Sequence, residues 1–216
     1  MYSKLQYISQ GSSTEEQLLN IKTVLDSGCT WIQLRFKNKP DDQILALAEK
    51  VRPLTEQYRS TLIINDSINI AKYVNADGVH LGLQDADISL AQSILGSNKI
   101  IGGTANTIHH IEQRVAEKCH YIGLGPFRYT ETKQNLSPIL GLAGYQSTLS
   151  QISKDASNIP IYAIGGIQLN DIDAILGIGI YGVAMSAALT HSQQSDIIQK
   201  FLVQKDEKLN YSRSGV

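Results

Sequence analysis

Short apolar segments alternate with helix-like segments along the whole chain, and no other feature constrains the fold as strongly. Eight segments have the length of β-strands, are rich in Ile, Val, Leu and Tyr, and are mostly bounded by Gly, Asp or Asn. They are Leu5–Ser9, Thr30–Lys37, Thr61–Asp66, Gly78–Gly82, Lys99–Thr104, Tyr121–Gly125, Ile159–Gly166 and Gly182–Ser186. Apolar strands separated by helices are typical of a parallel sheet that is covered on both faces.

Helical periodicity fills most of the segments between these strands. Thr14–Gln17 resembles a capping box and is followed by apolar residues at helical spacing. Further helices are predicted at Asp41–Tyr58, Asn106–Lys118, Gly141–Lys154, Asn170–Gly177 and Gln193–Val203, with a short one after Asp66. Pro53 lies inside Asp41–Tyr58, where a proline is expected to kink or shorten the helix.

The number of repeats selects the architecture. Eight strand–helix repeats in 216 residues leave about 27 residues for each, near the lower size limit of a (β/α)8 barrel. A doubly wound open sheet is the alternative, but no GxGxxG fingerprint follows the first strand. We therefore predict an α/β protein with a single-domain (β/α)8 TIM barrel over residues 1–203 and a polar tail at residues 204–216.

Composition and charge exclude several classes of protein. The formal net charge of −1 provides no basic field for nucleic acid. The apolar stretches are strand-sized, so no membrane span is predicted, and residues 1–10 lack the apolar block of a signal peptide. Cys29 and Cys119 lack the spacing of a zinc site and fit a reducing compartment. We expect a cytoplasmic protein without nucleic-acid or membrane partners, and a homo-oligomer stays open.

Charged and polar residues follow one strand after another, and in a parallel barrel these strand ends converge on one rim. Gln33, Arg35 and Lys37 alternate at the end of the second strand, so their side chains are expected on the same face. An amide, a guanidinium and an ammonium suit a multiply charged anion such as pyrophosphate. A solvated, ion-paired strand end is the alternative, but burying two cations without a ligand is costly, which favours the anion site.

Oxygen ligands follow the next two strands. Asn65 and Asp66 end the third strand, and Asp85 comes soon after the fourth. Magnesium in proteins takes one or two carboxylates and leaves its other positions to water and substrate phosphates. Either aspartate alone is better explained as a helix N-cap. Beside the basic cluster, Asp66 and Asp85 are predicted to hold Mg²⁺.

The later strands supply a second set of candidates. Thr130, Thr132 and Lys133 lie in a loop after the sixth strand, where two hydroxyls and an ammonium suit a phosphate, although such residues are common in loops. Gly165-Gly166 and Ser186-Ala187 end the seventh and eighth strands, where backbone amides of such barrels bind phosphate.

Two residues face the interior of the predicted barrel. Thr104 at the fifth strand adds a hydroxyl to the floor of the pocket. His80 lies on the inner face of GVHLG, where a hydrogen-bonded core histidine is more common than a catalytic one. The other histidines are assigned no role.

The residues thus predict two anion sites on one rim, which suits two phosphorylated substrates that are joined with loss of pyrophosphate. No Ser/His/Asp nucleophile set and no lysine placed for a Schiff base is found.

These motifs resemble those of the thiamine phosphate synthase family from about Leu5 to Leu189. The signatures are QLRFK (33–37), IINDSINIA (63–71), ADGVHLG (76–82), QDA (84–86), GLGPF (123–127), TETK (130–133) and AIGGI (163–167). The family joins 4-amino-2-methyl-5-hydroxymethylpyrimidine diphosphate to a thiazole phosphate, or its carboxylated form, with Mg²⁺ and by a dissociative mechanism.

The resemblance implies a role for each matching position. Catalytic roles fall to Arg35, Lys37 and Lys133. Gln33, Arg35, Lys37, Asn65, Lys133 and Thr104 would contact the pyrimidine diphosphate, and Asp66 and Asp85 the magnesium. Thr130 and Thr132 would contact the thiazole phosphate, along with the backbone at Gly166 and Ser186-Ala187, and Gly165 is a further substrate-binding candidate in the same loop.

The chain departs from the common family pattern in three places. Phe36 replaces an acidic residue, Thr104 replaces a serine, and Arg128-Tyr129 stands where Tyr-Pro is frequent. Two alternatives stay open: a thiazole tautomerase on the same barrel, which needs no pyrophosphate-and-magnesium set, and a phosphate-ligand sensor without turnover.

Overall fold

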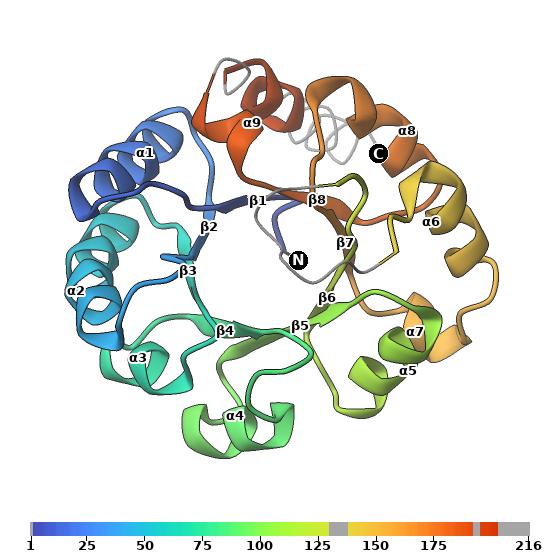
Figure 1. Cartoon of the computed structure of the whole chain (residues 1–216), viewed down its shortest axis with the longest axis horizontal. Helices are drawn as coiled ribbons and strands as arrows, with labels where there is room; N and C mark the ends of the chain where they lie inside the picture. Colours follow the sequence, from blue (N-terminus) through green and yellow to red (C-terminus); the bar gives the residue numbers. More distant parts are fainter. Residues whose placement is uncertain (1, 130–137, 192–194, 203–216) are drawn as a thin grey trace, which may run out of the picture.

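The fold is a closed barrel of eight parallel strands in chain order, as predicted (Figure 1). The computed structural model describes residues 2–129, 138–191 and 195–202. The strands form the inner ring and the helices surround it (Figure 1). The predicted tail at residues 204–216 lies outside the described residues.

The strands are short and each lies within its predicted segment, apart from the last residue of β5. Their bounds are β1 Leu5–Ile8, β2 Trp31–Leu34, β3 Thr61–Asn65, β4 Gly78–Leu81, β5 Ile100–Ala105, β6 Tyr121–Leu124, β7 Ile161–Ile164 and β8 Gly182–Met185. The helices are α1 Thr14–Asp26, α2 Asp41–Gln57, α3 Ile68–Tyr73, α4 Ile88–Leu95, α5 Ile108–Ala116, α6 Gly141–Leu149, α7 Lys154–Ser157, the 3₁₀ helix η1 Leu169–Asp171, α8 Ile172–Gly177 and α9 Ala187–Thr190. Residues 195–202 are helical as well.

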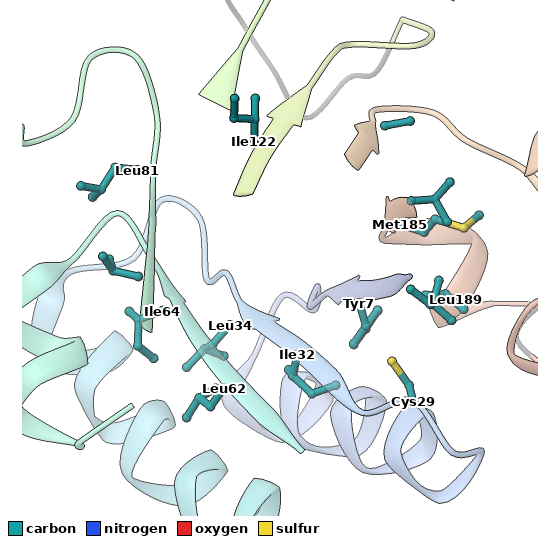
Figure 2. Close-up of a cluster of buried hydrophobic side chains, with 14 of the residues drawn as sticks. Tyr7, Cys29, Ile32, Leu34, Leu62, Ile64, Leu81, Ile122, Met185 and Leu189 are labelled. Atoms are coloured by element: carbon teal, nitrogen blue, oxygen red, sulfur yellow. The ribbon is translucent and has the colours of Figure 1, made fainter. Parts of the chain in front are cut away.

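Alternation along each strand divides the core into two layers. Outward residues such as Ile32, Leu62 and Ile64 belong to the large core between strands and helices (Figure 2). Inward residues form a separate cluster inside the barrel, in which Trp31 packs edge-on against Tyr121 and Tyr162 at centroid distances of 5.1 and 5.3 Å.

A glycine in β5 makes room for this interior aromatic cluster. A Cβ atom at Gly102 would lie 2.2 Å from Cζ of Tyr121, so only glycine admits the ring at this level.

β2 is shorter than the predicted Thr30–Lys37, because it ends at Leu34. Its neighbour β1 ends at Ile8, and beyond that point the hydroxyl of Ser9, instead of a backbone carbonyl, accepts the hydrogen bond from the Arg35 amide at 3.0 Å. The ladder therefore stops, and Arg35 and Lys37 follow the strand rather than belonging to it.

The helices differ from the prediction at three places. The four-residue α9 was not predicted. α4 was not predicted either, since its eight residues are held by burial of Ile88 and Ala91 rather than by a side-chain cap. The predicted helix Gly141–Lys154 is two helices, because Ser153 caps the start of α7 and accepts from the amide of Ala156. α2 continues past Pro53 to Gln57. Among the described residues, no helix is long and apolar enough to cross a membrane.

Truncating the interior aromatic cluster should destabilise the barrel. Trp31→Ala removes a side chain that is 1% exposed and is expected to lower the free energy of unfolding by about 3–5 kcal/mol. The midpoint of urea unfolding measures this loss. Tyr73→Ala, at a 69% exposed aromatic, is the control and should stay within about 0.5 kcal/mol of the wild type. Equal effects of the two substitutions would contradict the assignment of Trp31 to the core.

Candidate functional site

The ends of β3 and β4 place two carboxylates side by side on the rim. The amide of Asp66 donates to the carbonyl of His80 at 2.9 Å, which ties the end of β3 to β4. Asp66 has φ +67°, a left-handed conformation that Asp tolerates better than most residues. The carboxylate of Asp85 accepts from the Gly82 amide at 2.5 Å, which folds the β4 loop back toward Asp66.

The proximity of these carboxylates changes the chemistry of Asp66. Partial loss of water around the carboxyl, together with the hydrogen bond and charge of Asp85, raises the pKa of Asp66 above its usual range, while Arg35 opposes the shift. Both carboxylates are exposed on the rim. Two carboxylates this close repel each other when both are ionised, and a cation between them would relieve that repulsion. This donor set fits a divalent ion that takes its remaining ligands from phosphate oxygens and water. No group of three or more acidic, His or Cys ligands occurs in the described ranges.

Arg35 faces this carboxylate pair from the end of β2. Its carbonyl accepts from the buried Gln17 amide group at 3.1 Å, and its own amide is held by Ser9, so the backbone is fixed on both sides. Burial lowers the pKa of the Arg35 guanidinium, and the negative charge of Asp66 opposes that shift. Lys37 is exposed farther along the loop.

Gln33 lies deeper than the two cations. It is 2% exposed inside the barrel, so the three residues of the predicted cluster do not lie at one level. Because the strand ends at Leu34, only Arg35 and Lys37 extend onto the rim. The amide of Gln33 instead donates to the buried Gln6 side chain at 3.2 Å.

A chain of hydrogen bonds crosses the barrel interior from Gln33 to Thr104. Gln6 donates to the Tyr121 hydroxyl at 3.3 Å, Tyr121 and His80 Nδ1 are 3.0 Å apart, and His80 Nε2 and the Thr104 hydroxyl are also 3.0 Å apart. The Tyr121 oxygen accepts from the Gln6 amide, so we predict that its own proton goes to His80 Nδ1 and that a ring proton on Nε2 goes to Thr104. In that arrangement the Thr104 hydroxyl would donate its proton to a ligand at the rim.

His80 is therefore the hydrogen-bonded core residue that its position predicted. Sequence reasoning missed its partners Gln6 and Tyr121. The alternation of residues along the strands could have identified Gln6 and Tyr121. Both occupy inward positions of predicted strands, and a buried polar group there needs a hydrogen-bond partner.

A buried arginine supports the same side of the rim and was also missed. Arg114 on α5 is 4% exposed, and its guanidinium donates to the carbonyls of Gly82 and Thr104 at 3.0 and 3.1 Å. Arg114 thereby joins the ends of β4 and β5.

The loop after β7 presents backbone amides. Gly165 and Gly166 have φ +96° and +68°, and a Cβ atom at Gly165 would lie 2.9 Å from Pro126. The carbonyls of Ile164 and Gly165 accept from the amides of Phe127 and Arg128 at 2.8 and 2.9 Å. Neither the Gly166 nor the Ile167 amide has a backbone acceptor among the residues the structure describes.

The loop after β8 is next to this one in the barrel. Ser186 is half-buried and its hydroxyl donates to the Gln10 side chain at 3.1 Å, while Ala187, the first residue of α9, is exposed. Asn65 is half-buried at the end of β3 and its side chain contacts Asp66. Thr130, Thr132 and Lys133 lie outside the described residues.

Comparison with known proteins gives one consistent result. The family model described as thiamine monophosphate synthase matches residues 5–189. The chain is 56% identical to a thiamine-phosphate synthase of Flavobacterium psychrophilum, over 89% of this chain and 94% of the relative. It is 52% identical to that of Flavobacterium johnsoniae, over 97% of each.

Solved structures agree. A thiamine phosphate pyrophosphorylase from Pyrococcus furiosus superposes with a TM-score of 0.76 at 26% identity, covering 92% of this chain and 96% of that one. A 3-hexulose-6-phosphate synthase superposes with a TM-score of 0.67 at 17% identity, covering 92% and 97%, and shows only that the fold is shared.

The direction of the interior hydrogen-bond chain can be measured. Long-range ¹H–¹⁵N NMR of the imidazoles should find a ring proton of His80 on Nε2 and none on Nδ1. In Tyr121→Phe the donor to Nδ1 is lost, so this single tautomer should no longer be enforced and the free energy of unfolding should fall by about 1–3 kcal/mol. Tyr129→Phe, at a 62% exposed tyrosine, is the control. A proton on Nδ1 in the wild type would show that the chain runs in the opposite direction.

Proposed function

Because the chain belongs to the thiamine monophosphate synthase family, we propose that it joins 4-amino-2-methyl-5-hydroxymethylpyrimidine diphosphate to a thiazole phosphate. The products are thiamine phosphate and pyrophosphate, so the protein is a transferase of thiamine biosynthesis. The observation that supports this most directly is the pair Asp66 and Asp85 facing Arg35, on the other side of the closed ring from the amides of Gly165 and Gly166. Two separate anion sites are what two phosphorylated substrates require.

We assign Asp66 and Asp85 as the protein ligands of Mg²⁺. Both follow adjacent strands, and the pKa of Asp66 is raised by partial burial and by the neighbouring Asp85 carboxylate, whose repulsion a bound cation would relieve. A bound ion would stabilise the negative charge on the diphosphate oxygens and so make the C–O bond to the pyrimidine easier to break.

The cations of the rim stabilise the group that leaves. The C–O bond to the diphosphate breaks first and its electron pair departs with pyrophosphate, which gains negative charge. Arg35, Lys37 and Lys133 are proposed to balance that charge, and the fixed backbone of Arg35 means little reorganisation is needed. The resulting pyrimidine carbocation is captured by the lone pair of the thiazole nitrogen, which forms the new C–N bond.

The remaining residues bind and orient the substrates. Gln33, Asn65 and Thr104 are proposed to contact the pyrimidine diphosphate, with the Thr104 hydroxyl held by His80. The thiazole phosphate is proposed to bind the amides after β7 and β8. Its contacts are Thr130, Thr132, Gly165, Gly166, Ser186 and Ala187.

We place the reaction in the cytoplasm. Cys29 and Cys119 are buried free thiols, and burial raises their pKa values to about 11 and about 12. Inert unpaired thiols are compatible with a reducing compartment.

Purified protein should form thiamine phosphate from the two substrates and Mg²⁺, measured as thiochrome fluorescence. EDTA should abolish the product. Asp66→Ala should reduce turnover by orders of magnitude, because it removes half of the carboxylate pair. Asp87→Ala is the matched control, since Asp87 lies in the loop after β4 and its side chain makes no cap hydrogen bond.

The outcomes separate the candidate functions. Isomerisation of a thiazole phosphate without condensation would identify a tautomerase, and tight binding without turnover would identify a sensor. Product formation that survives EDTA and Asp66→Ala would overturn the metal assignment while leaving the synthase in place.

Lys133→Ala should lower kcat by about 10²–10³-fold, the usual cost of removing one group that stabilises developing charge. Single-turnover kinetics with saturating substrates isolates this step. Lys50→Ala, at an exposed lysine of α2, is the control. A normal rate in Lys133→Ala would remove this residue from the proposed mechanism.

A further inference from the structure

Arg128 is one of the positions where the chain departs from the common family pattern, and the structure gives it defined partners. Its guanidinium makes a two-pronged contact with the Asp171 carboxylate, Nη1 to Oδ2 at 2.5 Å and Nη2 to Oδ1 at 2.6 Å. Nη1 also donates to the Gly166 carbonyl at 2.8 Å. The loop after β6 is thereby joined to the loop after β7.

We infer that Arg128 and Asp171 are positioning residues that orient the amides of residues 165–167 toward the thiazole phosphate. Together, Arg128, Asp171 and the Gly166 carbonyl form a unit that we call the Arg128 clamp.

Three contacts made by residues 127 and 128 determine where three amides of the loop after β7 point, and the clamp supplies the third of them. The carbonyls of Ile164, Gly165 and Gly166 accept from the Phe127 amide, the Arg128 amide and the Arg128 side chain. In an extended strand successive carbonyls would alternate between the two sides, but here all three are directed at residues 127–128. In a trans peptide the N–H points opposite to the carbonyl. The N–H groups of residues 165 and 166 therefore point away from the backbone of residues 127 and 128, and the N–H of residue 167 points away from the Arg128 guanidinium.

The third of these contacts depends on a side chain alone. Two of the carbonyls accept from backbone amides, which almost any residue would supply. The Gly166 carbonyl accepts only from the Arg128 guanidinium among the described residues, and Gly166 is a positive-φ glycine with little conformational preference of its own. Without the clamp, the peptide between Gly166 and Ile167 can rotate and turn its N–H away from the phosphate.

The clamp is itself fixed. The Asp171 carboxylate also accepts from the Gln168 amide at 2.8 Å and is 13% exposed, so η1 holds the acceptor in place. The guanidinium lies 4.9 Å from the ring centroid of the buried Phe127. A bidentate contact to a held carboxylate is far more defined than an ordinary surface ion pair.

The inference rests on the proposed function and makes it more specific. Arg128→Lys keeps the charge but loses the fork, so it should raise KM for the thiazole phosphate about tenfold, in the usual range for residues that orient a binding group. KM for the pyrimidine diphosphate should stay unchanged, because its proposed site is on the other side of the ring. Arg128→Gln and Asp171→Asn should have the same effect.

Two further measurements and a control distinguish a positioning role from a general loss of stability. Combining Arg128→Gln with Asp171→Asn should add little to either change, since the two residues act as a unit. Hydrogen exchange of the ligand-free protein should be faster in Arg128→Lys than in the wild type at amides 165–167. Arg59→Gln, at an exposed arginine between α2 and β3, is the matched control and should alter nothing.

Full activity of Arg128→Lys would overturn the inference, because it would show that charge alone suffices. Equal increases in both KM values, or unchanged KM values in all variants, would overturn it as well. If the wild-type protein makes no thiamine phosphate, the proposed function fails. The clamp is then judged by exchange at amides 165–167 and by titration with the thiazole phosphate alone, where unchanged exchange or unchanged affinity in Arg128→Lys contradicts it.

Discussion

Closure of eight parallel strands into one ring is the constraint from which the rest of the structure follows. Every strand has hydrogen-bonded neighbours on both sides, so no edge is left unpaired. Because all strands run in the same direction, the residues after them meet on one rim. Residues from β2, β3 and β4 gather around the Asp66–Asp85 pair, while the glycines after β7 face a different part of the same opening.

The interior of the barrel is partly polar, and its hydrogen-bonded side chains connect to Thr104 at the rim. Gln6, Tyr121 and His80 satisfy one another below the site, where unpaired groups would be costly. In the predicted direction of this chain, the Thr104 hydroxyl would be a donor toward the rim. Below them the aromatic rings around Trp31 fill the barrel. A rigid floor of this kind lets the rim act on its substrates with little rearrangement.

The sequence predicted the fold almost completely, since strand length, apolar content and repeat number all depend on local pattern. All eight strands were found where their segments were predicted. α4 was missed because burial rather than local signals holds it, and β2 was drawn too long because its end depends on where β1 stops. The strand-end rule identified the candidate rim residues, but not the depth of Gln33 or the supporting contacts of Gln6, Tyr121, Arg114 and Asp171. Such contacts join residues far apart in the chain and leave no local pattern. The roles of the rim residues stay predictions.

His80 links two functions through one residue. Its carbonyl holds the amide of Asp66, while its ring holds the hydroxyl of Thr104. The residue assigned to the metal and the residue assigned to the pyrimidine are therefore both held by His80. The spacing between the carboxylate proposed to bind the metal and the hydroxyl proposed to contact the pyrimidine thus depends on the position of His80.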